Sequence, residues 1–409
     1  GSNPNEVNLG FEPQWVMIKN TGSSSAYAPW IMFDNMRGVN AGDTSSSSYG
    51  HDPALSANYS DSEGSTYNYA ANFIDFTPTG FKTFPSNTPT NVDTGNFIYM
   101  AIRRPNKPPT AATEVFAVAT GNSSNPIPAF VSNFTVDAAF LFNFNGGYDN
   151  YLLSRLTGDA YLRTNTNEAQ VTGTGETFDS NTGWARIYNS TYQSVMFKRA
   201  PGFMDVVAWV GDGTSVKNVS HNLEAVPEMV ISKMRLYSTS SSYGGDRWYV
   251  YHKDVNGVLG LNSNGGIVSS TGIFNSAPTA TNLPFDDPSY DSLAVNGSGI
   301  TYVAYLFATL PGISKVGSFS GTGSAINVDC GFTNGARFIL IKRINGTGDW
   351  YLWDSLRGIV SGNDPYLLLN VNTTQTTNTD YIDPLSTGFT VTSSAPAALN
   401  TSGGTYLFL

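Results

Sequence analysis

A strand-like phrase recurs four times along this chain and constrains its fold more than any other feature. Residues 13–19 (PQWVMIK) align without a gap with residues 227–233 (PEMVISK), and residues 337–342 (RFILIK) form a third copy. Residues 139–143 (AFLFN) form a fainter fourth. The copies recur at intervals of roughly 100 residues, the size of a small domain, whereas solenoid repeats span roughly 20 to 50 residues. We therefore predict a string of similar modules. Because catalytic constellations are usually unique, such repetition favours binding or scaffolding.

The pattern between these phrases predicts an all-β fold. Short apolar or alternating runs are separated by clusters of Gly, Asn, Ser and Pro, and no stretch of ten residues has helical periodicity. Charged residues make up only 13%, while Gly (41), Tyr (22) and Phe (24) are plentiful. We expect tandem antiparallel β-sandwich modules, jelly-roll or lectin-like, with little or no helix.

The order of motifs divides the chain into four modules. They span residues 1–108, 109–203, 204–312 and 313–409, and the second is the most divergent. Proline-containing joints at residues 105–109, 199–202 and 310–312 separate them. The first copy has no counterpart of the opening strand predicted at residues 316–319, and the last copy stops short of the third. We expect a fragment of a longer polypeptide, with modules 1 and 4 incomplete at the chain ends.

Charge and composition exclude several classes of partner. The net charge of −10 and the scattered basic residues argue against binding to nucleic acid, and no apolar run approaches the roughly 20 residues of a membrane helix. The single cysteine, Cys330, lies in a predicted strand at residues 326–332 and is interpreted as a buried structural thiol. The three histidines have no metal-ligand spacing. We expect no cofactor, no metal and no insertion into a membrane.

An Asp-x-x-Arg-Gly motif follows an aromatic strand in two copies. It could be a catalytic carboxylate steered by an arginine, or a turn in which Asp caps the backbone, Arg pairs with it and Gly takes a positive φ. The third copy has His252 at the Asp position and the second has Ser154, which favours a structural turn. The motif consists of Asp34, Arg37 and Gly38 in module 1, and of Asp354, Arg357 and Gly358 in module 4.

Other polar clusters give weaker signals. The segment 252–254 (HKD) could supply acid–base chemistry, but we expect a solvated strand end. Acidic residues at 61 and 63, and at 286, 287 and 291, could hold Ca²⁺, but they match no EF-hand loop and are expected in solvated loops. A glycosidase would need two carboxylates at a set distance, and the sequence cannot select such a pair.

Two loops have the composition of adaptable recognition surfaces. The loop after the first Asp-x-x-Arg-Gly motif is longer than its counterpart in module 4 and is rich in Tyr, Ser, Gly and Asn, as is a second loop in module 3. The alternative is a polar loop packed on its neighbour or on another subunit. The candidate binding residues are Tyr49, Tyr59, Tyr67 and Tyr69 in the first loop, and Tyr237 and Tyr243 in the second.

The order of motifs resembles a repeated module of tail-fibre and other virion structural proteins from marine bacteriophages, cyanophages among them. The resemblance rests on residues 10–19, 30–38, 299–308, 367–370 and 388–389, and on the joints at 198–207 and 310–317. It covers nearly the whole chain and is weak over residues 110–200. It implies location in the virion and contact with the host, and it brings no catalytic residues.

These expectations combine into a non-enzymatic phage appendage protein, such as a tail fibre, that contacts a glycan or protein of the host surface. We expect other virion proteins as partners, and a homo-oligomer. Two alternatives remain open. One is a carbohydrate-active depolymerase, which would have one cleft with two close carboxylates in a single copy. The other is a purely structural or decorating virion protein, or a bacterial surface adhesin, whose loops would be buried against partner subunits.

Overall fold

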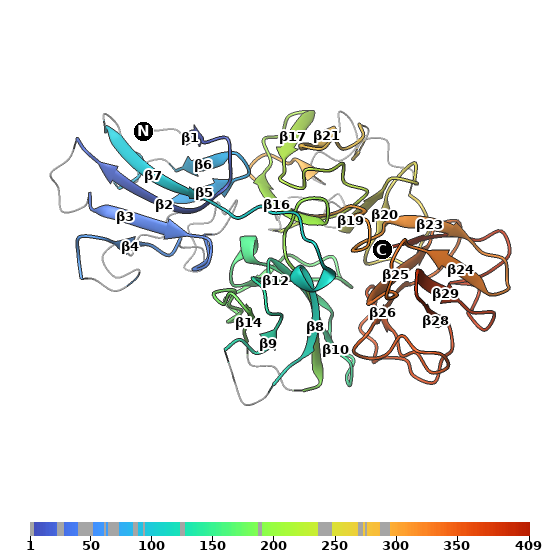
Figure 1. The fold of residues 1–409 in the computed structure, drawn as a ribbon. Coiled ribbons are helices and arrows are strands. Elements are labelled where there is room, and N and C mark those ends of the chain that lie inside the picture. Colours follow the sequence, from blue (N-terminus) through green and yellow to red (C-terminus); the bar gives the residue numbers. More distant parts are fainter. Residues whose placement is uncertain are drawn as a thin grey trace.

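The computed structural model confirms an all-β fold built from antiparallel sheets (Figure 1). Apart from two 3-10 turns, η1 (Ala112–Glu114) and η2 (Arg155–Thr157), the elements that the described residues form are strands. The structure describes residues 4–22, 28–39, 52–60, 63, 73–84, 89–92, 95–122, 127–186, 190–235, 248–268, 273–274, 276–286 and 295–409.

Module 1 is a sandwich of two sheets with the strand orders β4-β3-β2-β7 and β1-β6-β5. The residues of β2 alternate, so that Val16 and Ile18 point between the sheets and meet Phe33 and Phe81 in a buried core. The strands are β1 (Asn5–Asn8), β2 (Pro13–Asn20), β3 (Trp30–Asp34), β4 (Leu55–Ser56), β5 (Ile74–Thr77), β6 (Gly80–Thr83) and β7 (Phe97–Arg103).

Module 2 has a larger sheet, β13-β12-β11-β10-β15-β8, and a two-stranded sheet, β14-β9. Its internal core stacks Trp184 between Phe130 and Phe178. The strands are β8 (Phe116–Thr120), β9 (Phe130–Val131), β10 (Ala138–Asn143), β11 (Tyr151–Ser154), β12 (Ala160–Arg163), β13 (Val171–Thr172), β14 (Gly183–Trp184) and β15 (Tyr192–Phe197).

Modules 3 and 4 each have a five-stranded sheet whose edge is an opening strand, and the described strands of module 1 contain no counterpart of it. The orders are β16-β22-β18-β19-β20 with β17-β21 in module 3, and β23-β30-β25-β26-β27 with β24-β29-β28 in module 4. The strands of module 3 are β16 (Met204–Val210), β17 (Val216–Ser220), β18 (Met229–Met234), β19 (Trp248–His252), β20 (Leu259–Gly260), β21 (Asn282–Asp286) and β22 (Thr301–Phe307). Those of module 4 are β23 (Gly317–Ser320), β24 (Ile326–Asp329), β25 (Phe338–Arg343), β26 (Trp350–Asp354), β27 (Leu367–Leu368), β28 (Ile382–Leu385), β29 (Gly388–Val391) and β30 (Thr405–Phe408).

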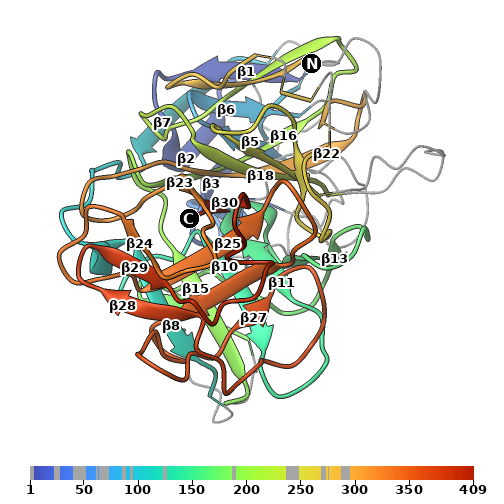
Figure 2. The same cartoon turned by 90° about the vertical axis from the view of Figure 1, so that its right-hand side faces the viewer.

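Modules 2, 3 and 4 share a further hydrophobic core in addition to the one inside each sandwich. The outer faces of their larger sheets meet, so that these strands are buried on both sides. At equivalent positions of the central strand this shared core contains Phe140, Ile231 and Leu340, and on the next strand Leu152, Val250 and Leu352. Figure 2 shows β27 of module 4 beside β11 of module 2. The three modules therefore pack as one body.

A cyclic set of hydrogen bonds closes this body into an approximate threefold ring. In each module one side chain lies just before, or at the start of, the strand that follows the central one (β11, β19 or β26). It donates a hydrogen bond to a backbone carbonyl of the neighbouring module in the ring. The three acceptors also occupy equivalent positions, because each pairs with the residue that follows the donor in its own module. The bonds are Trp248 to Arg163 (2.8 Å), Trp350 to Gly260 (2.9 Å) and Asn150 to Leu368 (2.8 Å).

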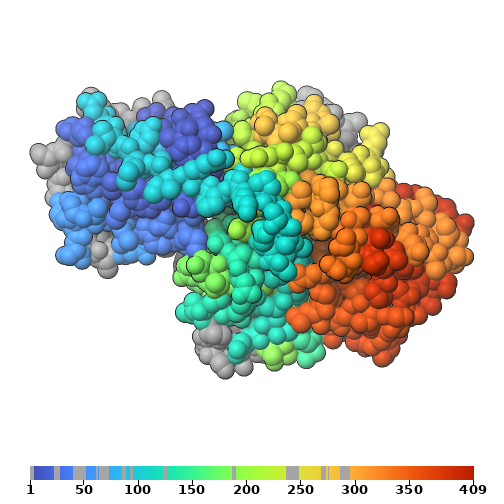
Figure 3. Space-filling view, in the orientation of Figure 1, coloured from blue at the N-terminus to red at the C-terminus, as the bar shows by residue number. Residues whose placement is uncertain are grey.

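Module 1 lies beside this ring and outside it. Figures 1 and 3 show it at the left, in contact with modules 2 and 3 along one side. Its outer sheet face does not enter the shared core.

Candidate functional site at the junctions of the modules

The Asp-x-x-Arg-Gly motif has the same geometry in modules 1 and 4. One carboxylate oxygen of Asp34 accepts the backbone N–H groups of Met36 (3.0 Å) and Arg37 (2.9 Å), and the other accepts Nε of Arg37 (2.5 Å). Asp354 makes the same three bonds, at 2.9, 3.0 and 2.6 Å. Gly38 and Gly358 end the turns at φ of 98° and 122°, a conformation that L side chains rarely adopt. Both carboxylate oxygens thus accept hydrogen bonds within the turn.

The other two copies cap the same turn with different side chains. Oγ of Ser154 accepts the N–H of Leu156 (3.1 Å), and Nδ1 of His252 accepts the N–H of Asp254 (3.2 Å). The expectation that His252 lies at a solvated strand end is wrong, because its side chain is fully buried. Burial lowers the pKa of His252 to about 4. A neutral imidazole here serves as a backbone acceptor.

Among the predicted recognition tyrosines, the structure describes Tyr59, which is 43% exposed. Tyr49, Tyr67, Tyr69, Tyr237 and Tyr243 lie outside the described residues. Of the acidic residues considered for Ca²⁺, Glu63 pairs with Arg37 (2.7 Å). The segment 287–294, which follows strand β21, lies outside the described residues.

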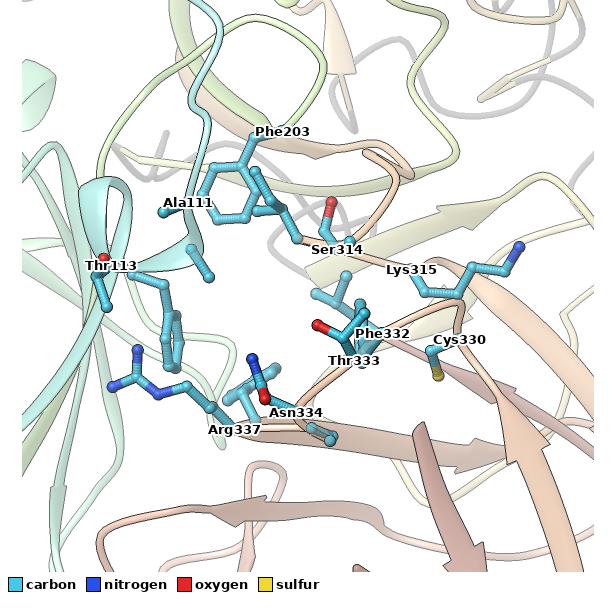
Figure 4. Close-up of a pocket in the computed structure, with 18 of the residues that line it drawn as sticks. Ala111, Thr113, Phe203, Ser314, Lys315, Cys330, Phe332, Thr333, Asn334 and Arg337 are labelled. Carbon is cyan, nitrogen blue, oxygen red and sulfur yellow. The ribbon is translucent and has the colours of Figure 1, made fainter. Parts of the chain in front are cut away.

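An apolar cavity opens where modules 2, 3 and 4 meet, and it has a volume of about 410 Å³ (Figure 4). Its walls are aromatic and come from all three modules: Phe116, Phe197, Phe203, Phe307, Phe338 and Phe408. Ring centroids of Phe197 lie 5.7 Å from Phe307 and 6.0 Å from Phe338, both in edge-on geometry. The cavity lies at the end of the ring opposite the cyclic hydrogen bonds. Phe197 and Phe307 end strands β15 and β22 and pair with the first residues of the central strands β10 and β18, whereas the hydrogen-bond donors lie near the last residues of those central strands.

One side of this cavity carries a cation. The guanidinium of Arg337 lies 5.3 Å from the ring centroid of Phe116, and its Nη1 is buried without a hydrogen-bond acceptor among the described residues. Figure 4 shows Arg337 on the side of Thr113 and the Lys315 side chain extending away from the centre. The arrangement can accept an apolar group that carries a hydrogen-bond acceptor for Arg337. Cys330 lines the same space, and burial raises the pKa of its thiol to about 12.

Sequence reasoning missed this cavity. Part of its lining comes from residues 110–116, which follow the predicted joint at 105–109, and from the predicted joint at 310–317. The rest comes from sheet faces that no motif distinguishes. The available signal was the run of apolar residues on both faces of the neighbouring strands, such as 140–142.

Comparison with known families assigns the chain. The family described as "Domain of unknown function (DUF7483)" matches residues 2–105 and 157–409. The chain belongs to the DUF7483 family. The match includes both Asp-x-x-Arg-Gly turns and omits residues 106–156, most of which belong to module 2, where the repeat is faintest. No curated protein and no solved structure matches the chain.

A buried ion network inside the DUF7483 match joins module 1 to the ring. Glu12 accepts Nη1 and Nη2 of Arg199 at 2.7 and 2.8 Å and lies 3.3 Å from Nε of Arg104. Arg199 also donates Nε to Asp205 (2.5 Å), and Asn222 donates to Glu12 (2.9 Å). Burial alone would raise the pKa of Glu12, but Arg104 and Arg199 lower it to about 2. Each charge is therefore matched by a partner at this junction.

A second cavity, of about 240 Å³, lies between the turn at residues 35–38 and module 2. Asp159 and Glu176 line it and approach each other through the hydroxyl of Thr174. Asp159 accepts three backbone N–H groups, from residues 174–176, at 2.6 to 3.0 Å, and Glu176 pairs with Arg186. Both carboxylates thus hold the loop in place.

The described residues contain no group of three or more His, Cys, Asp or Glu side chains that could hold a metal ion. In the same part of the chain, no helix has the length and apolarity needed to cross a membrane.

Proposed function

We propose that this DUF7483 chain is a non-enzymatic structural protein of a phage virion, part of a tail fibre or similar appendage that contacts the host surface. The observation that carries the proposal is that repeated sandwiches pack together as one body. The polar motif that repeats along the chain forms turns. The order of motifs, which resembles the modules of phage appendage proteins, supports the same conclusion.

In this proposal the ring is a rigid support and the loops make the contact. The shared core and the buried ion network fix the modules relative to one another. Tyr-rich loops on such a support present amphipathic rings at low conformational cost, which suits a glycan or a protein surface. Weak sites repeated over several copies gain avidity through effective concentration.

Adsorption to bacteria tests the proposal. The variant with Tyr49, Tyr59, Tyr67 and Tyr69 all replaced by Ala is compared with the parent chain for binding to a panel of marine bacteria and to a glycan array. The control is Tyr148→Ala, since Tyr148 is 56% exposed and lies in another module. We expect the parent chain and the control to bind and the loop variant to lose at least tenfold in retention.

The alternatives make different predictions in the same experiment. Equal binding by the loop variant and the parent chain would contradict the role of the loops and favour a purely structural or decorating protein. Release of reducing sugar ends from a bound polysaccharide would contradict the non-enzymatic assignment. Loss of that release in Asp159→Asn or Glu176→Gln would then identify the depolymerase.

A further inference from the structure

The outer sheet face of module 1 is built from the same positions as the faces that pack in the ring. The strand pairings place Met17 on β2 and Met32 on β3 at the positions of the shared core, with Leu55 on β4 beside Met32. Their counterparts in module 3 are Ile231, Val250 and Leu259, all buried between modules. We call the module 1 set the outer face; it also contains Trp15, Trp30, Ile98, Met100 and Ile102.

This outer face is apolar and open. Ile98, Met100 and Ile102 on strand β7 are 50%, 51% and 48% exposed. The corresponding residues of β22 in module 3, Val303 and Tyr305, are at most 1% exposed, because modules 2 and 4 cover them. Large aliphatic side chains exposed together on one sheet face mark an interaction surface.

The outer face also keeps the polar feature that closes the ring. Trp30 occupies the position of the donors Trp248 and Trp350, since it pairs with Lys19 as they pair with Lys233 and Lys342. The acceptor position is Ser56, which pairs with the residue after Trp30. An indole N–H and a backbone carbonyl are thus present in module 1 at the two places that a threefold contact uses.

The contacts of module 1 with the rest of the chain leave this face available. Those with printed hydrogen bonds run through Glu12, Met36, Pro78 and Asn106, which lie in the segment before β2 and in the turns or segments that follow β3, β5 and β7. Figure 3 shows module 1 against modules 2 and 3 along one side of the visible face.

We propose that the outer face of module 1 binds the same face of two further copies of this chain, so that three module 1 sandwiches form a ring like that of modules 2 to 4. In this trimer the indole of Trp30 donates to the Ser56 carbonyl of the next copy. Ile98, Met100 and Ile102 enter a shared core at the threefold axis. The occupant is argued from the ring itself, in which three copies of this module type already cover one another through these positions.

Native mass spectrometry and light scattering of the full 409-residue chain test the proposal. We expect a trimer for the parent chain. The double variant Ile98→Asp/Met100→Asp places six charges in the proposed core of the trimer and is expected to be monomeric. Both sites are about half exposed in the single chain, so its folding should be unaffected. The control Val226→Asp changes a residue that is 51% exposed outside the outer face, and it should remain trimeric.

A second variant tests the hydrogen bond separately. Trp30→Phe keeps the aromatic bulk and removes the donor, and should weaken each of the three interfaces about fivefold, the usual value of one hydrogen bond. A monomeric parent chain at concentrations up to about 100 µM, well above a Kd of about 1 µM, would overturn the proposal. So would a dimer, or a trimer that survives the double variant.

Discussion

Replacement of Glu12 by Gln should remove one identifiable part of the pH dependence of stability. Glu12 is buried between Arg104 and Arg199, which lower its pKa from 4.5 to about 2. A carboxyl whose pKa is lowered in the folded state stabilises that state fully above its unfolded pKa, and this stabilisation is lost as the pH falls from about 4.5 towards 2. A shift of this size corresponds to about 3 kcal/mol, at about 1.4 kcal/mol for each pKa unit.

The assay is urea unfolding followed by tryptophan fluorescence at intervals from pH 7 to pH 2, for the parent chain and for Glu12→Gln. Other titrating groups contribute to both proteins and cancel in the difference. At pH 7 the variant should be less stable by about 3 kcal/mol or more, because Arg199 and Arg104 lose a charged partner in a buried site. The gap should close as the pH approaches 2, where Glu12 of the parent chain becomes protonated.

A matched control is Glu168→Gln, the same substitution in an exposed pair with Arg163. It should change stability by less than about 1 kcal/mol at every pH. If the curves of the parent chain and of Glu12→Gln ran parallel from pH 7 to pH 2, the junction between module 1 and the ring would not depend on an ionised Glu12, and the reasoning would be refuted.

Three further predictions concern the ring and the sandwiches. Asn150→Leu should lower stability by about 2 to 4 kcal/mol, because it removes the donor to the partly buried carbonyls of Leu368 and Val371 in module 4; a change below about 0.5 kcal/mol in chemical unfolding would contradict this. Gly388→Ala should disrupt the pairing of β24 with β29, since its Cβ would lie 2.0 Å from the carbonyl oxygen of Val328, whereas Gly22→Ala, with 3.5 Å to the nearest atom, should be tolerated in thermal melts. Cys330 should react with an aromatic disulfide reagent only after unfolding, because burial raises its pKa to about 12; rapid reaction of the native chain would show an accessible thiol.

The sequence predicted the features that depend on local chemistry. The all-β fold followed from short strands separated by turn residues. The Gly-Phe pair at 388–389 entered only as part of the resemblance, and the structure supplies its reason: Gly388 and its counterpart Gly80 sit at a close approach, since a Cβ on Gly80 would lie 1.9 Å from the carbonyl oxygen of Val7. The Asp34 and Asp354 turns involve residues within three positions of one another, so spacing alone indicates their hydrogen bonds.

Features that depend on the packing of one module against another could not be predicted. Glu12 and Arg199 are 187 positions apart, and nothing in either segment indicates the other. We expected His252 to be solvated because it ends a strand. In the structure Val316 and Gly317 of the following module lie over that strand end. The sequence of one strand does not indicate which other segment covers it. The apolar residues on both faces of β10 and β25 were the one signal of the shared core, and sequence alone could not say which strands would meet.

Scanning calorimetry of the full chain tests the central claim, that modules 2, 3 and 4 are one body. The account predicts a single cooperative transition for residues 109–409, with an enthalpy of about 200 kcal/mol at about 0.7 kcal/mol per residue and a van't Hoff enthalpy that equals the calorimetric one. Module 1 should unfold in a separate transition, with a smaller enthalpy than that of residues 109–409. Three independent transitions of about 70 kcal/mol each would contradict the shared core and the ring of hydrogen bonds.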